Sequence, residues 1–241
     1  MIKTIVCEDY AEMSRRAADI VSAQLTLKPD SVLGFATGST PEGLYAELIK
    51  DNRAGKISFA QVHTVNLDEY YPIAPENDQS YRYFMNDRLF NHIDIDMANT
   101  NVPNGLAPDT AEEGKRYEAL IDSLGGIDLQ VLGIGHNGHI GFNEPAEQLD
   151  VITHCTDLTP STIKANSRNF ASEDEVPKQA MTMGMGSIFK ARRIIILING
   201  AGKADALAKM MSGKIDPACP ATLLSLHPNV TLLADKAALG L

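Results

Sequence analysis

Cysteine is scarce in this chain of 241 residues, which contains only Cys7, Cys155 and Cys219. Their odd number and wide separation leave no C-x-x-C pair, no zinc-ligand spacing and no disulfide framework. Such sparse cysteine is typical of proteins in a reducing compartment, so we expect a cytoplasmic protein.

Basic residues are also in the minority, with 21 Lys and Arg against 31 Asp and Glu and a net charge of −10. This charge opposes binding to nucleic acid or to an anionic membrane surface, and we expect neither partner. It repels phosphate as well. A phosphate site must therefore be built locally from helix N-termini and a few placed cations.

Long hydrophobic runs and linkers are absent. The longest aliphatic run, Ile194–Ile198, is too short to span a bilayer. Glu8, Asp9 and Glu12 stand where a signal peptide needs its apolar region. Without repeats, low-complexity tracts or Pro/Gly/Ser linkers, we expect a single domain over residues 1–241.

What the sequence does contain is an alternation of strand and helix patterns, with Asp9 as the expected N-cap of the first helix. Runs such as VLGFA and RRIIILI do not alternate apolar with polar residues, which is typical of strands covered on both faces. The pattern predicts an α/β three-layer sandwich, Rossmann-like, with a mostly parallel central sheet. The predicted strands are Ile2–Val6, Val32–Phe35, Val62–Leu67, Leu129–Ile134, Ile194–Ile198 and Val230–Leu233.

Ligands of such folds gather beyond the carboxyl ends of the strands, where three loops carry reactive or ligand-binding residues. In the first loop, which begins at Thr37, Gly38 allows close backbone approach, and Ser39 and Thr40 offer hydroxyls. Pro41 suits the first turn of the following helix, whose free N–H groups favour an anion. The alternative is an ordinary Ser/Thr cap, since the lysine of a P-loop is missing.

The second loop contains Asp68 and Glu69, followed by aromatic residues. It is either a solvated turn or the place of a base held among apolar rings, where desolvation raises the pKa of Asp68. Adjacent residues that leave a strand point in opposite directions. We therefore expect one of the two acids at a site, not both.

The third loop, residues 133–145, holds four glycines, two histidines and one carboxylate. It begins with G-x-G-x-x-G, but the later Gly, Asn and Pro residues oppose the helix of a dinucleotide site, so no nicotinamide cofactor is expected. His136 and His139 have no evident third metal ligand besides Glu144. A relay is favoured, in which Asn137 or Glu144 orients a histidine for proton transfer.

Two cations complete the candidate site. Arg168 lies in KANSRNF, and Lys203 ends a Gly-rich turn after Ile194–Ile198, at the sheet edge shared with the three loops. Either cation could instead be an ordinary solvated surface residue.

With these motifs the sequence closely resembles the glucosamine-6-phosphate deaminase family, in its short form, over nearly the whole chain. The resemblance implies conversion of glucosamine 6-phosphate and water to fructose 6-phosphate and ammonia, by ring opening, aldose–ketose proton transfer and deamination, without metal or organic cofactor. It rests on five motifs in the same order: ATGSTP at 36–41, NLDEYYP at 66–72, GIGHNGHIGFNEP at 133–145, ANSR at 165–168 and the turn that ends in Lys203.

The resemblance also implies residue roles. Asp68 would move the C2 proton toward C1, and His139 would assist ring opening with the support of Asn137 and Glu144. Some family members carry Asp at the position of Asn137, and an amide cannot stabilise an imidazolium by charge, so Glu144 is expected to contribute more here. The phosphate would be held by Thr37, Gly38, Ser39, Thr40, Arg168 and Lys203.

Two alternatives stay open. A 6-phosphogluconolactonase shares the broad fold, but such sequences resemble G-x-D-G-H-T-A-S-L-F-P where this chain continues HIGFNEP after Gly138. A non-catalytic sugar-phosphate sensor that regulates transcription should carry a basic helix-turn-helix segment, and none is visible.

Longer members of the resembling family are hexamers that use cations after the F-N-E-P motif to bind an allosteric effector. Here residues 146–156 contain no Arg or Lys and carry Glu147 and Asp150. We therefore expect no activation by N-acetylglucosamine 6-phosphate, and a monomer or small homo-oligomer.

Overall fold

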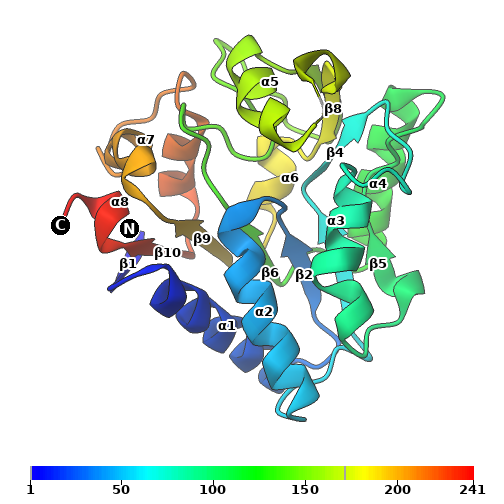
Figure 1. The fold of residues 1–241 in the computed structure, drawn as a ribbon, viewed down its shortest axis with the longest axis vertical. Helices are drawn as coiled ribbons and strands as arrows, with labels where there is room; N and C mark the ends of the chain where they lie inside the picture. Colours follow the sequence, from blue (N-terminus) through cyan, green and yellow to red (C-terminus); the bar gives the residue numbers. More distant parts are fainter. Residues whose placement is uncertain (1, 171) are drawn as a thin grey trace.

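A central sheet of seven strands, all parallel, organises the computed structural model, which describes residues 2–170 and 172–241 (Figure 1). The strand order is β1-β10-β9-β6-β2-β3-β5. The predicted α/β fold with a mostly parallel sheet is confirmed. The strands are β1 (Lys3–Cys7), β2 (Val32–Phe35), β3 (His63–Asn66), β5 (Thr100–Asn101), β6 (Leu129–Leu132), β9 (Ile194–Ile198) and β10 (Val230–Asp235).

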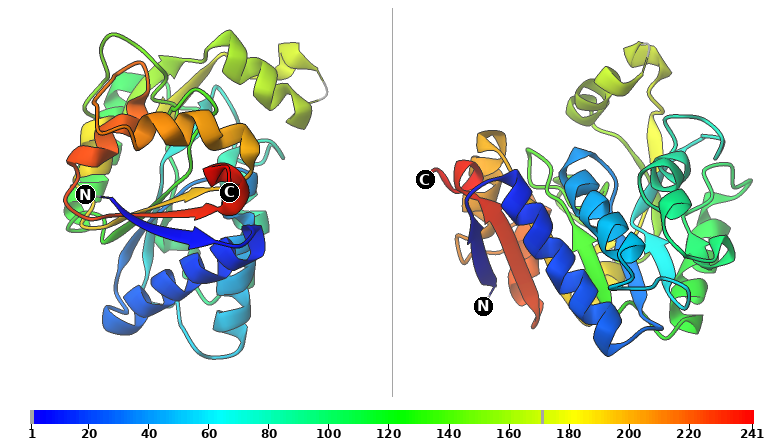
Figure 2. Two further views of the ribbon diagram at one scale, coloured as in Figure 1. Left: turned by 90° about the vertical axis from the view of Figure 1, so that its left-hand side faces the viewer. Right: turned by 60° about the horizontal axis from the view of Figure 1, so that its bottom comes forward.

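Helices cover both faces of this sheet, which explains why its strands lack apolar–polar alternation. In β9, Ile195 and Leu197 pack into one core and Ile194, Ile196 and Ile198 into the other. Figure 2 shows the resulting three layers. The first core contains side chains of α1 (Tyr10–Leu27), α2 (Ser39–Arg53) and α3 (Tyr81–Arg88), and the second those of α4 (Thr110–Ser123), α6 (Met185–Phe189), α7 (Ala204–Met210) and α8 (Lys236–Leu239).

The start of α1 and the bounds of two strands agree with the sequence prediction. Asp9 caps α1 as predicted, since its carboxylate accepts from the backbone N–H of Glu12 at 2.8 Å. The strands predicted at Val32–Phe35 and Ile194–Ile198 have the observed bounds. No helix among the described residues has the length and apolarity that a membrane crossing requires.

A second, antiparallel sheet was not predicted. Its order is β4-β8-β7, made of Asp68–Tyr71, Gln179–Thr182 and His154–Asp157. The expectation that Asp68 and Glu69 lie in a loop is therefore wrong, because the chain pairs with β8 directly after β3. Helix α5 (Pro160–Asn166) lies beyond this sheet, at one end of the molecule in all views (Figure 2). The 3₁₀ helices are η1 (Phe90–His92), η2 (Met97–Asn99), η3 (Ser167–Asn169), η4 (Glu173–Glu175), η5 (Ala201–Lys203) and η6 (Pro220–Leu226).

Candidate active site

Four segments with candidate residues meet at one edge of the main sheet. They follow β2, β3, β6 and β9, which are neighbours in the order β9-β6-β2-β3. Because these strands are parallel, their carboxyl ends lie side by side. Residues that are far apart in the sequence are thus brought to a common site.

Asp68, at the start of β4, is only 6% exposed. Burial, and secondarily the negative charge of Glu69, raises the pKa of the Asp68 carboxyl to about 8. The third loop comes directly against this carboxyl: a Cβ added to Gly141 would lie 3.4 Å from Oδ2 of Asp68 and 2.9 Å from Oγ1 of Thr182. Asp68 is thus a buried acid whose ionised form is poorly solvated. A carboxylate in this state has a raised pKa and is therefore a stronger base.

Glu69 binds the beginning of α3 instead. Its carboxylate accepts from the backbone N–H groups of Tyr70 at 2.9 Å, Tyr81 at 2.8 Å and Arg82 at 2.9 Å. Burial nevertheless raises the pKa of Glu69 to about 7. It is Asp68, not Glu69, that faces the third loop.

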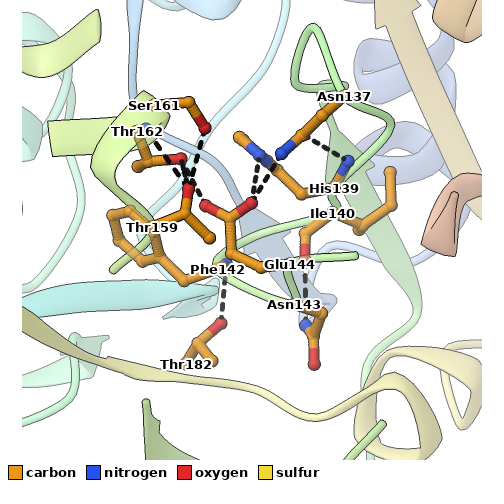
Figure 3. Close-up of polar contacts among 10 residues, drawn as sticks. All are labelled: Asn137, His139, Ile140, Phe142, Asn143, Glu144, Thr159, Ser161, Thr162 and Thr182. Atoms are coloured by element: carbon orange, nitrogen blue, oxygen red, sulfur yellow. Dashed lines mark hydrogen bonds and ion pairs between the residues drawn. The ribbon is translucent and has the colours of Figure 1, made fainter. Parts of the chain in front are cut away.

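The third loop brings His139, Glu144 and Asn137 together (Figure 3). Nδ1 of His139 lies 3.3 Å from Oε2 of Glu144, within ion-pair distance but not aligned as a hydrogen bond. The Asn137 amide donates to the same oxygen at 2.7 Å, and its own oxygen accepts from the His139 backbone N–H at 3.2 Å. Glu144 therefore contacts the imidazole, while Asn137 holds Glu144 and the loop backbone.

Glu144 keeps its negative charge although it is only 8% exposed. Burial alone would raise its pKa, but contacts with His139 and hydrogen bonds from Thr162 and Asn137 outweigh burial and lower it to about 2. A carboxylate that is ionised at neutral pH thus faces the His139 ring.

Gly135 determines where the His139 ring can lie. A Cβ at this position would stand 2.2 Å from Cε1 and 2.3 Å from Nε2 of the ring, so the imidazole rests against the Gly135 backbone. Residues 133–145, all of them described, form no helix, which removes the structural context of a dinucleotide-binding motif. Within the described residues, no group of three or more His, Cys, Asp or Glu is placed to hold a metal.

The first loop opens α2 with free N–H groups. Gly38 has φ of 100°, a conformation that favours glycine, and no side chain caps the helix at this position. The alternative of an ordinary Ser/Thr cap is therefore wrong at Gly38. The Thr40 hydroxyl donates to the Asn199 amide oxygen at 2.8 Å, which ties this loop to the segment after β9. The start of α2 is thus fixed in place and open to an anion.

Three basic side chains, Lys203, Arg168 and His136, lie close enough to influence one another's pKa. Burial lowers the pKa of the half-buried Lys203, and so does the charge of Arg168. The pKa of His136 is lowered chiefly by Lys203, then by burial, His139 and Arg168. These groups are close enough to repel one another, so a bound anion would relieve the repulsion.

Comparison with known proteins places this chain in a family. The model described as glucosamine-6-phosphate isomerases/6-phosphogluconolactonase matches residues 8–233. The chain belongs to this family. Glucosamine-6-phosphate deaminase of Halothermothrix orenii is 52% identical over 240 residues, with all of both chains covered. The protein of that name from Geobacillus sp. (strain WCH70) is also 52% identical over 240 residues, covering 100% of this chain and 96% of its own.

Solved structures with similar folds superpose on this chain. A monomeric glucosamine-6-phosphate deaminase superposes with a TM-score of 0.97 at 46% identity, covering 99% of each chain. The 6-phosphogluconolactonase of Thermotoga maritima superposes with a TM-score of 0.75 at 20% identity, covering 98% of this chain and all of its own. The second likeness shows a shared fold only. The resemblance to the deaminase family is thus confirmed.

Sequence reasoning missed several polar residues of this family site. Thr162 of α5 donates to Glu144, and Asn199 holds Thr40. Thr182 of β8 accepts from the Phe142 N–H at 3.1 Å. Asn199 opens the Gly-rich turn that ends in Lys203, whereas Thr162 and Thr182 stand in no motif with an obvious chemical purpose and reach the site only through tertiary contacts.

Proposed function

We propose that this chain converts glucosamine 6-phosphate and water to fructose 6-phosphate and ammonia. The observation that carries the proposal is a buried acid, a histidine–carboxylate pair and a helix start without a side-chain cap at one sheet edge, in a chain 52% identical to a deaminase over its full length. The reaction consumes water to release ammonia, so the enzyme is a hydrolase. We further propose a single cytoplasmic domain over residues 1–241, acting as a monomer or small homo-oligomer without metal or organic cofactor.

Ring opening falls to His139. Its imidazole takes the proton of the C1 hydroxyl and delivers a proton to the ring oxygen as the C1–O bond of the ring breaks. The charge of Glu144, 3.3 Å from Nδ1, stabilises the transient imidazolium, and Asn137 holds Glu144 in place.

Proton transfer between carbons falls to Asp68. Its carboxylate removes the C2 proton of the open-chain sugar and returns a proton to C1. The C1 oxygen gains the proton that the C2 ammonium group loses, so that C1 becomes a hydroxymethyl carbon and a C=N bond forms at C2. Water adds to that carbon, the C–N bond breaks, and ammonia leaves behind the C2 ketone. Burial suits Asp68 to this work, because a carboxylate with a raised pKa is a stronger base.

Phosphate binding falls to the start of α2 and the two cations. The residues proposed to hold the phosphate are Thr37, Gly38, Ser39, Thr40, Arg168 and Lys203. The deciding experiment is ammonia release from glucosamine 6-phosphate, measured beside hydrolysis of 6-phosphogluconolactone. A lactonase would act only on the lactone, and a sensor would act on neither.

Loss of either cation should weaken substrate binding more than turnover. We expect Arg168→Ala and Lys203→Ala each to raise KM about 10-fold or more, with a smaller fall in kcat, because phosphate is remote from the reacting carbons. Steady-state kinetics with glucosamine 6-phosphate measure the split. Lys164→Ala removes an exposed cation from α5 and should leave KM unchanged. Parental KM in both site variants would contradict the assignment.

N-acetylglucosamine 6-phosphate should not activate the enzyme. Residues 146–156 contain no Lys or Arg, and Thr153 donates its N–H and hydroxyl to buried Glu118 at 2.9 and 2.7 Å. This segment therefore presents carboxylates where an anionic effector needs donors. Initial velocity against glucosamine 6-phosphate should be hyperbolic and unchanged by the acetylated sugar phosphate. A sigmoidal curve that the effector makes hyperbolic would overturn this expectation.

A further inference from the structure

The side chain of Thr162 touches the catalytic pair from outside the three loops. Thr162 is the third residue of α5 and is 6% exposed. Its hydroxyl donates to Oε1 of Glu144, the oxygen that neither Asn137 nor His139 contacts (Figure 3). Both carboxylate oxygens are thus held, one by the loop itself and one by α5.

Further hydroxyls extend this contact. Thr159, the N-cap of α5, donates its hydroxyl to that of Thr162 at 3.1 Å, and the hydroxyls of Thr159 and Ser161 lie 3.0 Å apart. With Thr159 donating to Thr162 and Thr162 to Glu144, the hydrogens run in one direction, toward the carboxylate. Hydrogen bonds in such a chain polarise and strengthen one another.

The same short segment carries Arg168. Helix α5 runs into η3 without a break, because the backbone N–H of Ser167 donates to Ile163. Ile163 and Phe170 pack against the aromatic cluster of Tyr70 and Phe142. The segment from Thr159 to Arg168 is therefore one packed unit, with a contact to Glu144 near its start and the proposed phosphate ligand near its end.

We propose that Thr162 is a positioning residue that couples phosphate binding at Arg168 to the Glu144–His139 pair. The inference rests on the proposed function. When Arg168 engages the phosphate, the whole unit is fixed, and with it the hydroxyl that orients Glu144 against the imidazole. An unphosphorylated sugar leaves the unit less restrained. Phosphate thus contributes to turnover as well as to binding.

Thr162→Val, which removes the hydroxyl but keeps the shape, tests the positioning role. We expect kcat to fall roughly 10- to 100-fold, as for a lost hydrogen bond to a charged group, with KM unchanged because Thr162 touches no substrate. Loss of a donor disfavours the ionised form of Glu144, so its pKa rises and the acid limb of the pH–kcat profile moves to higher pH. Thr162→Ser should restore both readouts.

A double-mutant cycle tests the coupling. Arg168→Ala should lower kcat in the parent but have little further effect on kcat in the Thr162→Val background. Lys164→Ala, which truncates an exposed side chain of the same helix outside the hydroxyl chain, is the control and should keep parental kcat. Thermal melting of each variant separates lost positioning from lost folding.

Different outcomes would contradict different parts of the proposal. Parental kcat and pH profile in Thr162→Val would overturn the inference, and so would equal losses in Thr162→Ser and Thr162→Val, which would indicate packing alone. Independent, multiplicative effects of Thr162→Val and Arg168→Ala would overturn the coupling. Absence of ammonia release by the parent enzyme would instead overturn the proposed function.

Discussion

Asp68→Asn should lower kcat by about 10²–10⁴-fold while KM stays near the parental value, since a positioned proton acceptor is lost and the shape is kept. The amide fits the same buried place at the start of β4 but cannot take up the C2 proton. The decisive measurement is deuterium incorporation at C1 of fructose 6-phosphate formed in heavy water. Incorporation that continues at the parental rate would exclude Asp68 as the base.

The pH dependence offers a second readout of Asp68. Because burial raises its pKa to about 8, the base form accumulates as pH rises through that value, and kcat/KM should increase over the same range. In Asp68→Asn this limb should disappear. Glu69→Gln is the neighbouring comparison: it loses one of the two oxygens that accept N–H groups at the start of α3 and hence stability, but proton transfer to C1 continues. Its limb should move to lower pH, because the charge of Glu69 also raises the pKa of Asp68.

Gly135→Ala should lower kcat by about 100-fold with little loss of stability, because it displaces a catalytic ring rather than the core. The added Cβ would lie 2.2 Å from Cε1 of His139, and the imidazole at the end of its side chain can move away. Movement by even about 1 Å takes the ring out of line with Glu144 and with the sugar oxygens.

Gly133→Ala supplies the matched control for this variant. It adds the same methyl group to the same loop, two residues earlier, where a Cβ would meet nothing within 4 Å. Steady-state kinetics and thermal melting of both variants measure the contrast. Equal kcat in the two variants would show that the Gly135 backbone does not position His139.

The sequence by itself determined what is local in this protein. Uninterrupted apolar runs such as Ile194–Ile198 predict strands buried on both faces, and Asp9 predicts the start of α1, because strand burial and helix capping depend on residues a few positions apart. The motif loops, including Thr37–Pro41, could be assigned to one sheet edge because parallel strands end there together.

Tertiary structure alone decided the contacts between distant segments. The antiparallel sheet of β4, β7 and β8 escaped prediction because its strands, DEYY, HCTD and QAMT, contain no uninterrupted apolar run, and its pairing joins segments far apart in the chain. Thr162 reaches Glu144 only because α5 packs beyond that sheet, and Gly135 matters only because the loop folds His139 back onto it. Such contacts depend on how whole elements pack against one another. The sequence around each residue carries no periodic pattern that would predict this packing.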